Sequence, residues 1–366
     1  MKIAIVDGTR PEAIKMAPLY WAMTENIGFT PTLINTGQHS DLMDETLSSL
    51  NITADFDLFV MKDNQGLGAT ASELLMKLTN VLLKTKPDFV LVQGDTSTAL
   101  MGALAAFYLG IRVGHVEAGL RTKSIAEPFP EEGNRRALST LSSIDFCPTE
   151  VSKKNLLREG KSESTIYVTG NTGIDSLRKI QDKIFRGEIV PSKEIEKLVD
   201  LGQYVLVTCH RRESFGDAIQ KIMETISKIA QAKPGTNFIF PVHPNPNVKS
   251  VVERELSNIQ NVHLIKPVAY VDFVHLLNHC LFVISDSGGL QEEAPALGKR
   301  IVVLREDTER SEAVDEGYAF LVGSSPILIA ATVNELLSES LLPLDNSNIF
   351  GDGEASNRIL KILAGV

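Results

Sequence analysis

The 366-residue sequence predicts an α/β fold made of two Rossmann-like domains with a cleft between them. Short apolar runs typical of buried parallel strands alternate with segments of helical length and spacing along the chain. This alternation pauses once, over residues 170–191, and then restarts. The chain is also long enough for two domains of ordinary size.

The first half predicts a parallel sheet covered by helices on both faces, with right-handed crossovers. We expect strands at Lys2–Val6, Thr32–Asn35, Phe89–Gln93, Val113–Glu117 and Ile166–Val168. We expect helices at Pro11–Thr24, Ala69–Lys84, Ser97–Leu109 and Glu131–Leu141. The first of these helices has a proline at an early position, where proline is favoured.

The second half repeats the pattern after a predicted helix at Ile174–Phe185, so we place the domains at residues 1–170 and 171–353. The expected strands are Tyr204–Thr208, Phe238–Pro241, Val262–Ile265, Leu281–Ser285 and Ile301–Leu304. The expected helices are Asp217–Ala232, Val248–Leu256, Val271–His279 and Ile327–Ser338, with a last one at Glu354–Leu363.

The composition excludes several classes of partner. A formal net charge of −10 argues against nucleic acid and anionic membranes, so an anionic ligand needs local basic groups and backbone amides. No apolar run approaches the roughly 20 residues of a membrane span, and the N-terminal run is too short for a signal peptide. Cys147, Cys209 and Cys280 have no CxxC spacing, which indicates reduced thiols in a cytoplasmic protein. No motif suggests a metal site.

Three carboxylates follow apolar segments in the first half: Asp95, Glu117 and Glu131. The segment before Glu131 is Pro128–Pro130, and we interpret it, like the other two segments, as a short buried parallel strand. Ligands of open parallel sheets bind at the carboxyl ends of the strands, so these acids could point into one crevice. Such a group of acids suits proton transfer. The alternative is that they are loop acids or helix caps.

Two turns have the features of anion sites. Gly8–Glu12 links the first strand to the first helix, where free amides meet the positive end of the helix. Arg10 adds a bidentate donor, and Lys15 could face the same site. The alternative is an ordinary turn with Arg10 in a surface ion pair.

The second such turn is Ser285–Glu293, which follows an apolar strand. Ser287, Gly288 and Gly289 can bring backbone amides close to a diphosphate. Glu293 falls one turn into the next helix, where it could accept hydrogen bonds from ribose hydroxyls.

His210, Arg211 and Arg212 form a cationic cluster after another strand. A histidine here could bind a phosphate or act as an acid on a leaving group, although the arginines could simply pair with Glu213. His243, at a further strand end, is as suited to a structural role as to a ligand contact.

These segments together resemble the non-hydrolysing UDP-N-acetylglucosamine 2-epimerase family. The matching blocks occur in family order over nearly the whole chain: Gly8–Lys15 with Met16–Leu19, Thr36–His39, Gln93–Thr96, His115–Thr122, Pro128–Glu132 with Asn134 and Arg135, His210–Glu213, Ser285–Glu293 and Thr308–Arg310.

The resemblance implies a GT-B-like arrangement with the active site in the interdomain cleft and UDP bound mainly by the second domain. It also implies a homodimer, and a C-terminal helix, residues 354–366, that returns to the first domain. The implied catalytic residues are Asp95, Glu117, Glu131 and His210. The implied substrate-binding residues are Arg10, Lys15, His243, Ser287, Gly288, Gly289 and Glu293.

The implied reaction is reversible epimerisation of UDP-N-acetylglucosamine to UDP-N-acetylmannosamine. UDP leaves by anti elimination, giving a 2-acetamidoglucal, and adds back with the proton on the other face of C2. Carboxylates can stabilise positive charge at C1, and clustered acids raise one another's pKa so that one can hold a proton. Inversion needs a group on each face, and no redox cofactor is required.

Four alternatives remain open. A hydrolysing 2-epimerase would release N-acetylmannosamine and UDP, although the Gly8–Lys15 block favours the non-hydrolysing kind. A 2-epimerase of a related UDP-acetamido sugar would use the same residues. The set of acids argues against a retaining glycosyltransferase on the same fold, and a non-catalytic nucleotide-sugar sensor would not need it.

The sequence departs from the family pattern in two places. Asp307 and Ser311 replace a threonine and a proline in a loop that lies near the nucleotide in the family. Bacterial members also bind a second, activating UDP-N-acetylglucosamine. Gln38, His39 and Gln65 match positions that line this allosteric site, whereas Asp41 and Asn64 stand where glutamine and arginine are usual.

We therefore expect weak or altered activation, because losing a cation and adding an acid both disfavour a diphosphate. The measurement is the rate of epimerisation of UDP-N-acetylmannosamine alone and with a trace of UDP-N-acetylglucosamine. A rate that is negligible until the trace is added would contradict this expectation.

Overall fold

The computed structural model describes residues 1–37, 46–60, 65–210, 216–338 and 344–366. The chain forms two compact units. The first comprises Met1–Lys179 and Phe350–Val366, and the second comprises Ile180–Ile349. The boundary expected after residue 170 lies just before helix α7 (Thr172–Phe185), whereas the division falls within that helix.

Within the described residues, the first unit has a seven-stranded sheet whose neighbouring strands all pair in parallel. The strand order is β3-β2-β1-β4-β5-β6-β7, so the chain reverses direction across the sheet between β1 and β4. Ligands of such sheets bind at this switch point, beyond the carboxyl ends of the strands. The strands are β1 (Lys2–Asp7), β2 (Thr30–Asn35), β3 (Phe56–Asp57), β4 (Phe89–Gln93), β5 (Arg112–Val116), β6 (Ile144–Cys147) and β7 (Ile166–Val168).

The helices of the first unit are α1 (Arg10–Thr24), α3 (Leu67–Thr85), α4 (Ser97–Tyr108), α5 (Glu131–Leu141), α6 (Glu150–Arg158), the 3₁₀ helix η1 (Glu163–Thr165), the start of α7, and α15 (Ala355–Ala364). Of these, α3, α4 and α5 bury apolar side chains against this sheet, whose central strand β4 is buried along its whole length.

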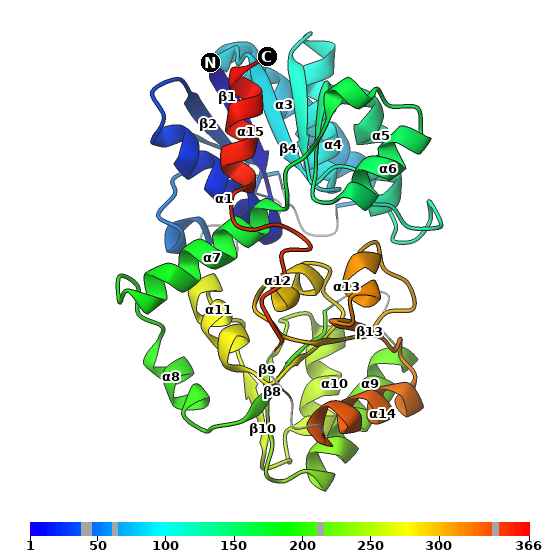
Figure 1. The fold of residues 1–366 in the computed structure, drawn as a ribbon. Coiled ribbons are helices and arrows are strands. Elements are labelled where there is room, and N and C mark those ends of the chain that lie inside the picture. The colour runs from blue at the N-terminus through cyan, green and yellow to red at the C-terminus, as the bar shows by residue number, and fades with distance from the viewer. Residues whose placement is uncertain (38–45, 61–64, 211–215, 339–343) are drawn as a thin grey trace. The chain divides into compact units, whose positions relative to one another are not determined.

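The C-terminal helix α15 packs on α1, and both chain termini lie at the same end of this unit (Figure 1). Asp175 of α7 holds the start of α15, because its carboxylate accepts hydrogen bonds from the amides of Ala355 (3.1 Å) and Ser356 (2.7 Å). These contacts satisfy amides that have no partner within their own helix.

The second unit, as far as it is described, has a six-stranded parallel sheet in the order β10-β9-β8-β11-β12-β13, with its switch point between β8 and β11. Its strands are β8 (Tyr204–Thr208), β9 (Asn237–Pro241), β10 (Val262–Ile265), β11 (Val283–Ser285), β12 (Ile301–Val303) and β13 (Ala319–Leu321). Its helices are the end of α7, α8 (Lys193–Val199), α9 (Asp217–Ala232), α10 (Pro246–Leu256), α11 (Tyr270–His279), α12 (Leu290–Ala296), α13 (Ser311–Asp315) and α14 (Pro326–Ser338).

The two parallel α/β units confirm the prediction of two Rossmann-like domains. Each expected strand and helix is present, with ends that shift by at most a few residues. The sequence reading missed β3, β6, β13, α6, α8, α12 and α13. The missed strands have two to four residues and are too short to show a period of their own.

One sequence interpretation is wrong. Pro128–Pro130 is a loop before α5 and not a strand, and Phe129 is 70% exposed. Proline has no amide hydrogen for a ladder, so this apolar segment cannot pair as a central strand does.

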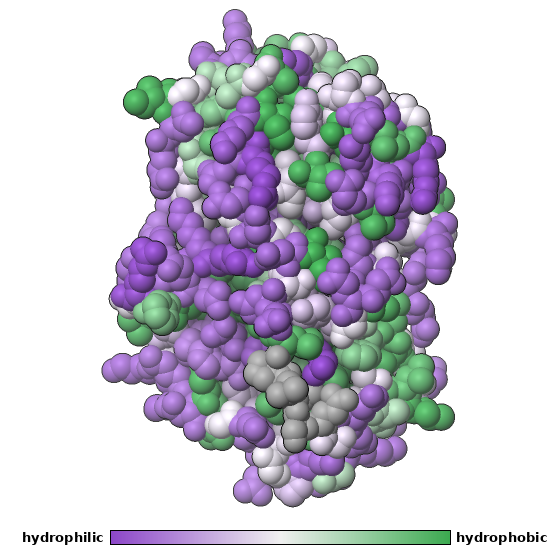
Figure 2. Space-filling model, viewed as in Figure 1, coloured by the Kyte–Doolittle hydropathy of each residue, from purple (hydrophilic) through white to green (hydrophobic). Residues whose placement is uncertain are grey.

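On the face shown in Figure 2, hydrophilic residues cover most of the surface and hydrophobic ones occur singly or in small groups. None of the helices in the described parts of the chain has the length and apolar character needed to cross a membrane.

Candidate active site

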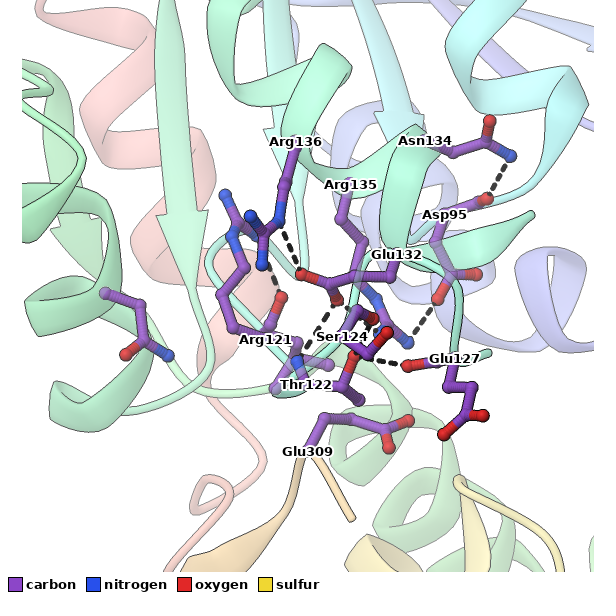
Figure 3. Close-up of polar contacts among 12 residues, drawn as sticks. Asp95, Arg121, Thr122, Ser124, Glu127, Glu132, Asn134, Arg135, Arg136 and Glu309 are labelled. Carbon is purple, nitrogen blue, oxygen red and sulfur yellow. Dashed lines mark hydrogen bonds and ion pairs between the residues drawn. The ribbon is translucent and has the colours of Figure 1, made fainter. Parts of the chain in front are cut away.

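Asp95 lies in the turn after β4, beside the switch point of the first sheet. Two residues of α5 hold it from one side (Figure 3). Arg135 pairs with its carboxylate, with 2.5 Å between Nη2 and Oδ2, and Asn134 donates to its backbone carbonyl at 2.7 Å. The α5 helix therefore fixes both the backbone and the side chain of Asp95.

Arg135 is itself held by a second carboxylate, that of Glu132, which is fully buried. Glu132 accepts from Arg135 Nη1 at 3.1 Å, from Arg136 Nε at 3.0 Å and from the amide of Thr122 at 3.1 Å (Figure 3). These contacts join the loop after β5, the start of α5 and the turn after β4.

Glu117 follows β5, the strand next to β4, and has a left-handed backbone with φ of 65°. This conformation is uncommon for a residue with a side chain and is often found at functional sites. Lys15 of α1 pairs with its Oε2, and Asn171 Nδ2 donates to the same oxygen at 2.6 Å. Both contacts favour the carboxylate form of Glu117.

Glu131 is the first residue of α5, in the helix that binds Asp95 through Asn134 and Arg135. Its Oε2 atom is buried and has no hydrogen-bond partner among the described residues. A buried carboxylate oxygen without a partner carries a desolvation cost, which a proton or a bound hydroxyl would relieve. Glu131 therefore differs from Asp95 and Glu117, each of which has a cation.

A further acid, Glu12, lies between the turns after β1 and β4. Thr9 and Glu12 form a capping box at the start of α1: the Glu12 carboxylate accepts from the Gly8 amide at 3.1 Å and from Thr9 Oγ1 at 2.8 Å. Its other oxygen accepts from Thr96 Oγ1, which caps α4. Burial raises the pKa of Glu12 to about 7. The hydrogen bonds lower this pKa, and the charge of Asp95 raises it by a smaller amount.

Asp7, the last residue of β1, is also buried, and its Oδ1 has no hydrogen-bond partner in the described part of the chain. Burial raises its pKa well above the ordinary value, and the charges of Glu12 and Asp57 raise it further. The carboxyl end of β1 thus adds two acids that favour their neutral forms.

His115 supports the turn after β4 from the neighbouring strand. It is fully buried, and its Nε2 lies 2.8 Å from the carbonyl oxygen of Gly94. Burial lowers the pKa of His115, which favours the neutral ring. A neutral ring with its proton on Nε2 can donate to Gly94 and so fix the residue before Asp95.

Arg10 and Lys15 have different surroundings. Arg10 is the first residue of α1, beyond β1, and is half-buried. Lys15 is buried and lies against Glu117, so the structure places it with the acids rather than at the open end of the helix.

In the second unit, two turns leave the switch point between β8 and β11. Ser285 pairs with Thr208 across the two strands, so Asp286 and Cys209 follow at the same edge. The fully buried Asp286 accepts from the amide of His210 at 3.0 Å and from Cys209 Sγ at 3.3 Å, and Oδ1 lies 3.2 Å from His210 Nδ1.

The turn after β11 continues into α12. The Ser287 amide donates to Ser285 Oγ at 2.9 Å, and Gly288 and Gly289 follow before α12 begins. A Cβ atom on Gly289 would meet nothing within 4 Å, so the protein's own packing leaves open space at this position. Glu293 accepts from the Tyr270 hydroxyl at 2.8 Å.

The loop that contains Asp307 and Ser311 is bonded to α12. Thr308 Oγ1 donates to Gln291 at 2.6 Å, and Arg310 Nε donates to Glu292 at 2.6 Å. Ser311 begins α13, at a helix position where proline is also favoured, so serine can take the place of the family's proline there.

Two further residues have local partners. His243 Nδ1 accepts from the Asn245 amide at 3.2 Å, and its ring stacks on that of His210, with 5.8 Å between centroids. Gln65 donates to Glu73 at 3.1 Å. Other predicted residues lie outside the described part of the chain: Arg211, Arg212, Glu213, Gln38, His39, Asp41 and Asn64.

A sequence profile described as UDP-N-acetylglucosamine 2-epimerase matches residues 22–364. The chain belongs to the UDP-N-acetylglucosamine 2-epimerase family. A Yersinia pestis protein with that name is 44% identical over 99% of this chain and 98% of its own length. A Campylobacter jejuni protein with the same name is 44% identical over 99% of this chain and 97% of its own.

Among solved structures, the UDP-GlcNAc 2-epimerase from Neisseria meningitidis bound to UDP-GlcNAc is similar to this chain with a TM-score of 0.93. The two chains are 42% identical, and the match covers 100% of each. The family resemblance expected from the sequence blocks is therefore confirmed.

This epimerase chain has further polar residues at its candidate site that sequence reasoning did not single out, among them Asp7, Glu12, Glu132, Asn171 and Asp286. A capping-box pattern, Thr9-x-x-Glu12, could have indicated Glu12. Asn171 and Asp286 gave no such signal, because their partners are far away in the sequence.

We expect Glu12→Gln to weaken the dependence of stability on pH. The pKa of Glu12 rises from 4.5 to about 7 on folding. Between these values only the folded protein binds the proton, so the stabilisation is complete below about pH 4.5 and is lost as the pH rises through about 7. Its full size is on the order of 3 kcal/mol.

The measurement is the free energy of unfolding in urea at pH 5 and pH 8. Wild type should lose more stability over this interval than Glu12→Gln, and the exposed control Glu188→Gln should match wild type. The same loss in wild type and Glu12→Gln would show that Glu12 does not take up this proton.

Proposed function

We propose that this protein interconverts UDP-N-acetylglucosamine and UDP-N-acetylmannosamine by inverting C2 of the sugar. The observation that carries the proposal is the gathering of Asp95, Glu117 and Glu131 around one edge of the first sheet, where two of them pair with cations and the buried Oε2 of Glu131 has no hydrogen-bond partner among the described residues. Inversion through elimination and re-addition needs this mixture, because one acid group must take a proton and another must supply one.

The contacts suggest a division of roles. Asp95 and Glu117 pair with Arg135 and Lys15, and a carboxylate that stays charged can stabilise positive character at C1 or accept the C2 proton. Oε2 of Glu131 is buried without a hydrogen-bond partner among the described residues, so proton transfer at this oxygen disrupts no hydrogen bond there. We therefore propose that Glu131 is one of the acids that exchange a proton with the sugar.

We propose that the second unit binds the UDP part of the substrate. Gly288 and Gly289 have backbone amides at the switch point, where open sheets bind ligands, whereas the Ser287 amide donates to Ser285 Oγ. His210 supplies a donor for the diphosphate, and Glu293 supplies a carboxylate for the ribose. UDP held in this way stays available to add back to the glucal.

Several relatives carry names or ligands that fit this proposal. The Neisseria meningitidis structure holds UDP-GlcNAc, and a structure from Methanocaldococcus jannaschii holds UDP-GlcNAc and UDP. Retention of UDP distinguishes the proposed reaction from that of a hydrolysing 2-epimerase, in which water would replace UDP. A homodimer located in the cytoplasm remains a prediction, which sedimentation and cell fractionation can test.

The test of this function is incubation with UDP-N-acetylglucosamine in deuterium oxide, followed by NMR. We expect UDP-N-acetylmannosamine with deuterium at C2 in both sugars. Free N-acetylmannosamine would indicate a hydrolysing enzyme. If neither exchange nor product appears with this sugar, while a related UDP-acetamido sugar exchanges, the substrate assignment is wrong.

Substituting the three acids separates their role from nucleotide binding. We expect Asp95→Asn, Glu117→Gln and Glu131→Gln each to lower kcat by at least roughly 10²-fold, because each loses a proton-transfer or charge-stabilising group. UDP affinity, measured by calorimetry, should stay within about threefold, since UDP binding is assigned to other residues.

The control is Glu163→Gln, an exposed acid on η1, which should leave kcat unchanged. Near-normal turnover in any one of the three variants would remove that residue from the catalytic set. Loss of UDP binding together with turnover would instead point to a binding role.

A further inference from the structure

We propose that Asp286 is a positioning residue that holds the His210 ring through Nδ1 and leaves Nε2 to face the diphosphate. The inference deepens the proposed function and rests on it for the role of His210. It names the group that orients this histidine.

The strand pairing brings the two residues together. Ser285 and Thr208 are partners at the ends of β11 and β8, and their hydroxyl oxygens lie 2.6 Å apart. Asp286 and Cys209, the residues that follow, therefore lie side by side at the carboxyl ends of the two strands. This places the Asp286 carboxylate directly against the turn formed by Cys209 and His210.

Asp286 contacts both the backbone and the ring of His210. Its side chain is fully buried, and its oxygens accept from the His210 amide at 3.0 Å and 3.2 Å. The Nδ1 atom lies 3.2 Å from Oδ1. A buried carboxylate needs donors, so the arrangement favours a proton on Nδ1.

A proton on Nδ1 determines what Nε2 can do. In the neutral ring Nε2 is then the acceptor, and in the charged ring it is a donor while Asp286 balances the positive charge. The charged ring held in this way can give its Nε2 proton to an oxygen of the leaving diphosphate, and the resulting neutral ring can take the proton back at Nε2 when UDP returns.

The surroundings of the ring agree with this role. The His210 side chain is 41% exposed although Nδ1 lies against a fully buried group, so the exposed part is on the other side of the ring. The His243 ring stacks on one face at an interplanar angle of 22°. The ring is therefore constrained at one nitrogen and on one face, and Nε2 has no hydrogen-bond partner among the residues that the structure describes.

The first test measures which ring nitrogen of His210 carries the proton. In protein labelled with [¹⁵N]histidine, the resonances of His210 can be assigned by their loss in His210→Asn. We expect the neutral ring of wild type to carry its proton on Nδ1. A neutral ring that carries its proton on Nε2 would overturn the proposal, whatever the substrate of the enzyme.

The second test uses Asp286→Asn, whose amide keeps the size of the side chain but not its charge. We expect His210 to lose its preference for Nδ1–H and kcat to fall at least about tenfold. The acidic limb of the kcat profile against pH should also move, which loss of packing alone would not cause.

The matched control is Cys209→Ala, which removes another donor to Asp286 and leaves the His210 ring and the Asp286 carboxylate in place. It should keep the wild-type tautomer, with kcat within about threefold of wild type. Unchanged tautomer and turnover in a folded Asp286→Asn would overturn the proposal. An inactive wild type would instead contradict the proposed function, and the tautomer measurement would still stand.

Discussion

The contact of Arg135 with Asp95 and Glu132 is the interaction on which the candidate site depends most. One guanidinium joins a buried carboxylate of its own helix to the acid at the end of β4. Because Glu132 also binds the amide of Thr122, three loops are held by a single charge network. Removing one partner of a buried pair commonly costs about 3–5 kcal/mol, since the other charge is left without compensation.

Several other buried charged residues are also held by partners of opposite charge or by hydrogen-bond donors. Lys15 and Asn171 satisfy Glu117, and in the second unit Arg310 binds Glu292 of α12 while Asp286 receives donors from Cys209 and His210. Glu131 departs from this pattern, because its buried Oε2 has no hydrogen-bond partner among the described residues. A site that moves protons needs one acid that is not fixed in its charged form.

Most of the fold could be read from the sequence, because buried parallel strands are continuous apolar runs and their helices are long. The elements that were missed are short, as with β3, or lie in mixed polar segments, as with α8. Pro128–Pro130 was misread because apolar composition alone does not show that prolines cannot join a ladder.

The sequence by itself determined the α/β class, the family blocks, and the positions of the acids and of the glycine-rich turn after β11. It could not show which cation faces which acid. Lys15 and Glu117 are 102 positions apart, and Asn171 and Glu117 are 54 apart. Only the order of strands in the sheet brings such residues together. Burial raises the pKa values of Asp7 and Glu12, and burial depends on the packing of the whole unit, so only the tertiary structure decided that these two acids favour a proton.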